Sequence, residues 1–225
     1  MHFIAGLHSG VLWTWGIALV CVLTLALRVL YVLFQRKPAT ARTKPAKTLI
    51  VLGSGGHSAE MLMLLDKMDK ARYSPRSYVV AATDRMSGPK ALARERIWQN
   101  EDSPTGFNIH HIPRSREVGQ SYVTSVITTL YSLVFAFVLV LREVPDLVLV
   151  NGPGTCIPIC AAAFVYRVFG LMGTRIVYVE SIARTRRFSL SAKLLYHLRM
   201  ADLVFVQWEQ LTRTYPRALY AGRLY

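Results

Sequence analysis

One short segment, residues 48–69 (TLIVLGSGGHSAEMLMLLDKMD), constrains the fold of this chain more than any other. An apolar run leads into a glycine-rich turn that ends in His57, and apolar residues at helical spacing follow. This pattern predicts a buried strand over Thr48–Leu52, a tight turn, and an amphipathic helix over Ser58–Lys70. Such a unit directs backbone N–H groups and the positive end of a helix dipole at one point. The segment therefore predicts a phosphate or diphosphate site with a titratable imidazole beside it.

The apolar segment before this unit predicts a membrane anchor. Residues Val11–Phe34 carry a single charge, Arg28, and are long enough to cross a bilayer, which takes about 20 apolar residues. A cleavable signal peptide is the alternative, but the segment lacks a basic N-terminal region and a small-x-small site before its basic flank. We therefore expect residues 1–34 to form an N-terminal segment with one transmembrane helix.

The stretch after the anchor predicts its orientation. Residues 35–47 have no acidic residue and several basic ones: Arg36, Lys37, Arg42, Lys44 and Lys47. The N-terminal flank carries only His2 and His8. Basic residues mark the cytosolic side of a span, so the N-terminus is expected in the lumen and the body in the cytosol. Pro38 and Pro45 make this stretch an extended linker.

The charge of the chain narrows the choice of partner. Lys and Arg number 27 against 13 Asp and Glu. A basic domain beside a bilayer most simply faces anionic head groups or an anionic lipid substrate. Nucleic acid is the other common partner of a basic chain. It is disfavoured here because the arginines are scattered among loops and no tail is dense in Lys or Arg.

Further apolar runs alternate with helical patterns along the rest of the chain. The strands are expected over Ser77–Ala82, Phe107–Ile112, Asp146–Val150, Arg175–Val179 and Leu203–Gln207. This alternation predicts one α/β domain over residues 48–225, built on a single Rossmann-like parallel sheet covered on both faces. The uncharged run Ser121–Leu141 could be a second span, but a crossing there would split the alternation. A helix packed on the sheet is preferred, and whether it touches the bilayer stays open.

A second glycine loop follows the predicted fourth strand. Its residues Asn151, Gly152, Gly154 and Thr155 repeat the arrangement of Ser54, Gly55 and Gly56 after the first strand. Parallel sheets bind ligands at the carboxyl ends of their strands, so the two loops are expected to form opposite walls of one crevice. The first loop lacks the third glycine of the dinucleotide fingerprint and the lysine of a P-loop, which leaves a nucleotide-dependent oxidoreductase as a weak alternative.

Charged residues follow two other predicted strands at the same edge. Arg114 and Arg116 come after the third strand and can pair with phosphate oxygens. Glu180 leaves the fifth strand, where its carboxylate could bond a sugar hydroxyl or pair with Arg184. The cysteines Cys156 and Cys160 are interpreted as small core residues.

Five segments together resemble one family. They are LIVLGSGGHSAEM, IPRSREVGQS, PDLVLVNGPGTCIPI, IVYVES and FVQW. These resemble the membrane-anchoring subunits of the eukaryotic dolichol-linked N-acetylglucosaminyltransferase, which belong with the asparagine-linked glycosylation enzymes. The resemblance runs from the anchor to the C-terminal GRLY. The body is also similar to the N-terminal half of MurG-type GT-B glycosyltransferases.

The resemblance implies a split, inverting GT-B enzyme in the endoplasmic reticulum membrane, which is continuous with the nuclear membrane. This chain would be its acceptor-side half, inactive alone. A soluble cytosolic catalytic chain would hold UDP-GlcNAc and dock on the C-terminal tail, in a heterodimer or a larger complex. The complex would add the second GlcNAc to GlcNAc-diphosphodolichol. No cofactor or metal bound by this chain is implied. A non-catalytic membrane adaptor with a vestigial site is the alternative.

The resemblance also implies roles for residues of the predicted crevice. The loop from Ser54 to Gly56 would hold the acceptor diphosphate, assisted by Arg114 or Arg116. His57 would be the candidate base for the acceptor hydroxyl, and Glu180 a second candidate for sugar contact.

Overall fold

The computed structural model describes residues 2–35, 42–99, 106–115, 120–152 and 154–225. It divides into two units, residues 1–38 and 39–225. The boundary between them falls within the predicted linker, most of whose N-terminal half lies outside the described residues.

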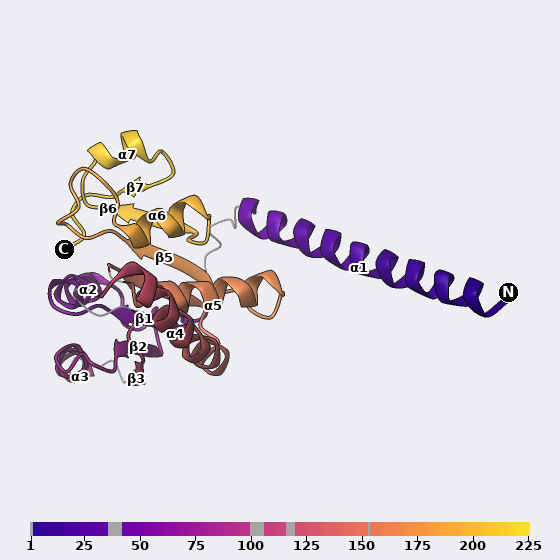
Figure 1. Cartoon of the computed structure of the whole chain (residues 1–225). Helices are drawn as coiled ribbons and strands as arrows, with labels where there is room; N and C mark the ends of the chain where they lie inside the picture. Colours follow the sequence, from indigo (N-terminus) through magenta and orange to yellow (C-terminus); the bar gives the residue numbers. More distant parts are fainter. Residues whose placement is uncertain (1, 36–41, 100–105, 116–119, 153) are drawn as a thin grey trace. The chain divides into compact units, whose positions relative to one another are not determined.

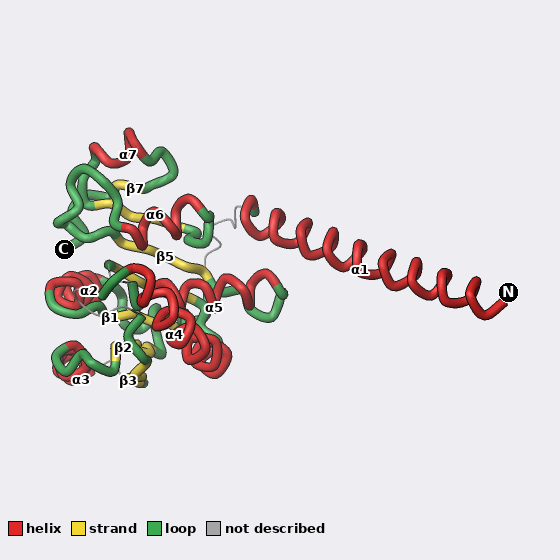
Figure 2. The backbone as a smooth tube through the Cα atoms, in the orientation of Figure 1, coloured by secondary structure: helices red, strands yellow, loops and turns green. Residues whose placement is uncertain are grey.

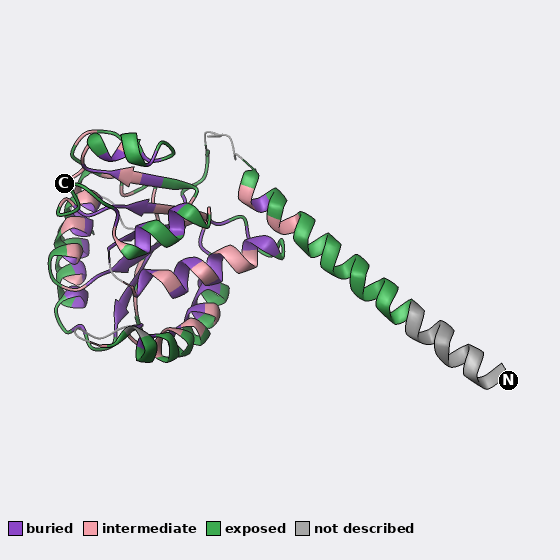
Figure 3. Cartoon of the chain, turned by 45° about the horizontal axis from the view of Figure 1, so that its top comes forward, coloured by how far each residue is buried: buried purple, intermediate pink, exposed green. Residues whose placement is uncertain are grey.

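The first unit is a single apolar helix. Helix α1 covers His2–Phe34, and its part from Trp13 to Phe34 has a mean hydropathy of 2.6, long and apolar enough to cross a membrane. Most of its described side chains are exposed (Figure 3). The predicted apolar N-terminal helix is therefore confirmed as a candidate span.

The second unit is built on one parallel sheet (Figure 1, Figure 2). The strand order is β3-β2-β1-β4-β5-β6-β7, and every neighbouring pair is parallel. The strands are β1 (Thr48–Leu52), β2 (Arg76–Ala81), β3 (Phe107–Ile112), β4 (Leu147–Asn151), β5 (Arg175–Val179), β6 (Leu203–Val206) and β7 (Leu219–Tyr220). The predicted Rossmann-like parallel sheet is confirmed, and six strands agree with their predicted bounds to within a residue. The short strand β7 was not predicted.

Helices cover both faces of the sheet, as Figure 1 shows. One face carries α2 (Gly56–Lys67) and α3 (Ser87–Gln99), and Ile50 and Leu52 of β1 point into the core beneath them. Leu49 and Val51 point into the core on the other face. That face carries α4 (Tyr122–Glu143), α5 (Cys156–Val168) and α6 (Leu190–His197), and the short helix α7 (Gln210–Thr214) joins the same core. Strand residues that alternate between two apolar cores explain why these strands are apolar throughout.

Helix α4 contains the long uncharged run of the sequence. Ala136 and Val140 are fully buried, and the hydroxyl of Tyr166 in α5 donates to the carbonyl of Phe137 at 2.9 Å. The run therefore forms a helix packed on the body, as expected. Its outer face stays exposed and apolar, and it includes Val123, Val126, Ile127, Leu130, Val134 and Val138. Residues Val123–Glu143 also pass the length and hydropathy test for a span.

Ser121 is the N-cap of α4, and its Oγ accepts a hydrogen bond from the backbone N–H of Thr124 at 3.2 Å. Replacing an N-cap serine by alanine leaves this N–H without its partner. We expect Ser121→Ala to lower the free energy of unfolding by about 1 kcal/mol. Denaturant unfolding of the full chain in detergent measures this, and Ser121→Asp, which keeps an acceptor oxygen, should retain wild-type stability. Equal losses in both variants would contradict the cap.

The carboxylate of Glu143 ties the end of α4 to the sheet. It accepts a 2.6 Å hydrogen bond from Ser77 Oγ and lies 3.2 Å from His110 Nε2 and 3.6 Å from Lys47 Nζ. Burial alone would raise the pKa of this carboxyl, but the bond from Ser77 and the charges of Lys47 and His110 outweigh it. The pKa therefore lies below its ordinary value.

This lowered pKa predicts acid sensitivity. The folded state binds the proton of Glu143 less readily than the unfolded state, so its stabilising effect is complete above the unfolded pKa of about 4.3. That effect is lost as pH falls through the lower folded pKa. We expect Glu143→Gln to weaken the fall of unfolding free energy between roughly pH 5 and pH 3. Glu209→Gln, at an exposed carboxylate, is the control; identical profiles for wild type and Glu143→Gln would contradict the prediction.

Candidate functional site

The two glycine loops meet where the strand order reverses. Strands β1 and β4 are neighbours, with Val51 opposite Val150, and both loops leave their carboxyl ends. The side-chain amide of Asn151 donates to the backbone carbonyl of His57 at 2.8 Å and so joins the loops. Reversal points of this kind are where open α/β sheets bind ligands. The structure thus brings together the two predicted walls of the crevice.

The imidazole of His57 lies against the backbone of Gly152. A Cβ atom built on Gly152 would stand 2.4 Å from His57 Nδ1, and Gly152 has φ +73°, a backbone conformation that side chains disfavour. Only glycine allows this contact. Gly152 is therefore the part of the second loop that sets the position of the histidine ring.

Gly152→Ala is expected to displace this ring. The positive φ should cost about 1–2 kcal/mol of stability, and the new methyl group must also push the imidazole aside. Gly222→Ala is the matched control, because Gly222 has φ +77° but no atom within 4 Å of a built Cβ. Thermal unfolding should show similar strain in both variants, and the NMR signals of the His57 imidazole should shift only in Gly152→Ala. Unshifted His57 signals in Gly152→Ala would contradict the role of this contact.

The first loop opens helix α2 without a side-chain cap. Gly55 is the N-cap with φ +67°, and Gly56 begins the helix. Nη2 of Arg114 donates to Ser54 Oγ at 2.7 Å, which places the guanidinium at this loop. Free N–H groups at a helix start and a nearby arginine suit an anionic group. The other predicted arginine, Arg116, lies outside the described residues.

The second loop opens helix α5. Thr155 is its N-cap but makes no side-chain cap bond, and a Cβ on Gly154 would meet no atom within 4 Å. This helix start therefore also presents N–H groups without a side-chain acceptor among the described residues. Two such starts beside one another strengthen the case for an anionic ligand.

Asp84, after β2, serves the framework of the first loop. Its carboxylate accepts from the backbone N–H groups of Met86 and Ser87 and from Ser87 Oγ, the last at 2.6 Å. Ser87 Oγ in turn lies 2.9 Å from Ser58 Oγ and 3.2 Å from the carbonyl of Gly53. This carboxylate caps the start of α3 and braces the glycine turn.

Glu60 was not predicted as a site residue, but it lies next to His57. Its Oε2 is 3.5 Å from His57 Nδ1, and its Oε1 accepts a 2.7 Å bond from Ser181 Oγ. Burial alone would raise the pKa of Glu60, yet the contacts with His57 and Ser181 hold it below its ordinary value. Helix residues three apart share a face, so the spacing of His57 and Glu60 was the signal available in the sequence.

Glu180, the second candidate for sugar contact, is fully buried in this conformation. Its carboxylate accepts from the backbone N–H groups of Ser181 at 3.0 Å and Ser189 at 2.8 Å, and from the hydroxyl of Tyr178 at 3.2 Å. The described contacts include no ion pair with Arg184. Burial raises the pKa of this carboxyl despite these bonds. In this conformation Glu180 stabilises the loop after β5 by accepting hydrogen bonds from its backbone.

The C-terminal segment packs beside Glu180 and Gln207. The hydroxyl of Tyr225 donates to the carbonyl of Glu180 at 3.3 Å, and Leu224 N–H donates to Gln207 Oε1 at 2.9 Å. Burial raises the pKa of the Tyr225 phenol, and so does the charge of the nearby Glu60.

Four buried polar atoms around the crevice have no hydrogen-bond partner in good geometry within the described chain. They are His57 Nδ1, Glu60 Oε2, Asn151 Oδ1 and Gln207 Nε2. Buried polar groups are normally satisfied, so such a cluster is typical of a functional site rather than of a core. Among the described residues, no three His, Cys, Asp or Glu side chains gather as metal ligands would.

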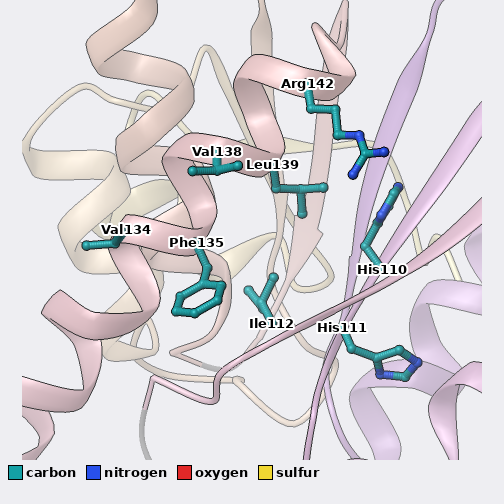
Figure 4. A pocket seen from close by; sticks show the side chains of 8 residues that line it. All are labelled: His110, His111, Ile112, Val134, Phe135, Val138, Leu139 and Arg142. Atoms are coloured by element: carbon teal, nitrogen blue, oxygen red, sulfur yellow. The ribbon is translucent and has the colours of Figure 1, made fainter.

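A separate pocket of about 330 Å³ lies at the edge strand, between β3 and α4 (Figure 4). Arg142 and His110 lie toward one end, and Val134 and Phe135 toward the other. Strand β2 separates β3 from β1, so this pocket is distinct from the crevice.

Comparison with known proteins places the chain in a family. Residues 48–224 match the family described as "Oligosaccharide biosynthesis protein Alg14 like". A Rattus norvegicus protein named "UDP-N-acetylglucosamine transferase subunit ALG14" is 47% identical over 92% of this chain and 100% of its own length. The proteins of the same name from Homo sapiens and Candida albicans are 44% and 39% identical, over 92% and 90% of this chain and 100% and 92% of theirs.

Among solved structures, Acinetobacter baumannii MurG aligns with 80% of this chain at a TM-score of 0.48 and 15% identity. The chain spans 44% of the length of that structure. The sequence matches extend over nearly the whole sheet-bearing unit and both glycine loops. On that basis, this chain belongs to the Alg14-like family of oligosaccharide biosynthesis proteins.

Proposed function

We propose that this chain is the acceptor-side, membrane-anchoring subunit of a two-chain N-acetylglucosaminyltransferase. The complex transfers GlcNAc from UDP-GlcNAc to GlcNAc-diphosphodolichol and so adds the second sugar of the N-glycan precursor. The relatives' shared name, a UDP-N-acetylglucosamine transferase subunit, supports the donor and the need for a further chain. The observation that carries the acceptor role is the meeting of the two glycine loops, with His57 at a helix start that has no side-chain cap.

The acceptor diphosphate binds at the first loop in this proposal. The backbone N–H groups at Gly55, Gly56 and His57 and the guanidinium of Arg114 surround the start of α2. A helix N-terminus and a charged arginine both stabilise phosphate oxygens. The basic linker and the apolar helix α1 keep this site near anionic lipid.

His57 acts as the general base. Its imidazole removes the proton from the acceptor 4-hydroxyl while that oxygen forms a bond to C1 of the donor GlcNAc. The bond from C1 to the UDP oxygen breaks, UDP leaves with the electron pair, and configuration at C1 inverts. The proton then passes from the imidazole to solvent. Stabilisation of the leaving UDP comes from the partner chain.

Location and assembly follow from the same proposal. The anchor crosses the endoplasmic reticulum membrane once, with its N-terminus in the lumen and the body in the cytosol. The soluble partner docks at the C-terminal segment, where Leu224 and Tyr225 already pack against the crevice. Together the two chains form the two halves of a GT-B enzyme.

Transfer from UDP-GlcNAc to a GlcNAc-diphosphate-polyprenol in detergent tests this function. The full chain is assayed alone and with its cytosolic partner, and we expect transfer only in the mixture. Transfer by the chain alone would mean that the donor site lies within this chain. A stable complex in which changes at Gly55, Gly56 and His57 leave transfer intact would instead support the adaptor.

A further inference from the structure

We infer that Glu60, held by Ser181, is a positioning residue that orients the imidazole of His57 with Nδ1 toward the carboxylate and Nε2 toward the acceptor hydroxyl. The catalytic consequence rests on the function proposed above. The orientation itself is a property of this chain alone. It follows from three contacts made by the segments that follow the neighbouring strands β1, β4 and β5.

The first contact comes from the helix that carries the histidine. His57 and Glu60 are three residues apart in the first turns of α2, and His57 Nδ1 lies 3.5 Å from Glu60 Oε2. The side chain of His57 is 35% exposed, but its Nδ1 is buried. The exposed part of the ring is therefore on the Nε2 side, away from the carboxylate.

The second contact fixes the plane of the ring. A Cβ on Gly152 would lie 2.4 Å from Nδ1, 2.5 Å from Cγ and 2.6 Å from Cε1 of His57. These distances are nearly equal, so the face of the ring packs against the backbone after β4. Gly152 therefore restricts rotation of the ring, whose Nδ1 lies near Glu60.

The third contact holds the carboxylate. Ser181, in the loop after β5, donates from Oγ to Glu60 Oε1 at 2.7 Å. This bond occupies one carboxylate oxygen and turns the other toward His57. A base oriented by a third group is the arrangement that activates histidine in nucleophile–base systems on unrelated folds.

The 3.5 Å separation is long for a hydrogen bond, as is common before substrate binds, and it should shorten as the imidazole gains a proton. The other titratable groups near the pair are Tyr225 and Glu180. Burial raises the pKa of the Tyr225 phenol, which therefore stays neutral near pH 7. Glu180 is turned away, toward the N–H groups of Ser181 and Ser189. Glu60 is therefore the charge that faces His57.

The test compares Glu60→Gln, His57→Ala and the double variant in the assembled complex. We expect Glu60→Gln to lower kcat by roughly 10- to 100-fold, part of the 10²–10⁴ that a general base provides, with KM changed less than about twofold. The double variant should be no slower than His57→Ala, because the two residues act as a unit.

Asp66→Asn is the matched control, since it neutralises another carboxylate of α2, in an exposed pair with Arg94, and should leave kcat unchanged. Ser181→Ala should weaken transfer in the same direction as Glu60→Gln, with a smaller effect. Additive losses in the double variant, or an effect of Glu60→Gln on KM alone, would overturn the positioning role.

A second readout does not depend on transfer. Nitrogen NMR of the His57 imidazole in the full-length complex, assigned by its loss in His57→Ala, should show the proton on Nδ1 in wild type and a mixture of tautomers in Glu60→Gln. The same spectrum for both proteins would overturn the inference. If His57→Ala retained transfer while Glu60 still set the tautomer, the base assignment would fail and the positioning contact would stand.

Discussion

His57→Ala is expected to lower the turnover of GlcNAc transfer by the assembled complex by roughly 10²–10⁴, the range that general base catalysis contributes. The ring is partly exposed and lies at the start of α2, where the glycine loops after β1 and β4 meet. Because alanine leaves the backbone N–H groups of the loop in place, acceptor binding should change far less than turnover. Initial rates at saturating acceptor and donor, with KM for the acceptor, measure both quantities.

His111→Ala is the matched control, because His111 is exposed on the edge strand β3 and lies outside the crevice. It should leave kcat at the wild-type value. Co-purification of the partner chain and the melting temperature establish that His57→Ala still folds and assembles. If that intact complex kept wild-type turnover, the base would have to be another group, and the acceptor role of the crevice would rest on the loops alone.

The sequence predicts the sheet well because its signal is local. Apolar runs such as Thr48–Leu52 face two cores, so every residue in them is buried and their bounds are clear. The glycine loops carry an equally local signal, since positive φ at Gly55 and Gly152 demands glycine. Strand β7 has only two residues and depends on pairing with β6. Two residues are too few to form a periodic pattern, so the sequence does not predict this strand.

The candidate site was only partly predictable because its contacts are distant in sequence. Ser181 reaches Glu60 from the loop after β5, and Tyr225 reaches the same place from the C-terminal segment. Neither contact leaves a pattern in a single sequence. For Glu180, the place at the end of β5 was predicted from the sequence, but its burial was not. That burial depends on hydrogen bonds from the N–H group of Ser189, the N-cap of α6, and from the hydroxyl of Tyr178 in β5.

Arg76→Met is expected to lower the free energy of unfolding by about 3–5 kcal/mol, the largest stability effect that we predict. Arg76 begins β2 and is 2% exposed, and its Nε and Nη2 donate to the two carboxylate oxygens of Glu95 at 2.6 and 2.8 Å. Without the guanidinium, Glu95 would be a buried charge whose remaining partner is the Tyr78 hydroxyl. Denaturant unfolding of the full chain in detergent measures the loss.

Replacing both charged residues tests whether the loss in unfolding free energy comes from leaving the Glu95 carboxylate buried without its partner. The double variant Arg76→Met/Glu95→Leu should recover about 2 kcal/mol or more relative to Arg76→Met, since apolar residues often replace a buried ion pair at little cost. The neighbouring pair of Arg94 and Asp66 is the control; its side chains are 44% and 32% exposed, and Arg94→Met should cost only about 0–1 kcal/mol. Equal losses for Arg76→Met and the double variant would mean that Arg76 stabilises the fold through the carbonyls of Lys70 and Tyr73, which its Nη1 also contacts. Recovery in the double variant would instead show that the loss in Arg76→Met comes from leaving the Glu95 carboxylate buried without its partner. The ion pair between α3 and the sheet would then add little stability of its own.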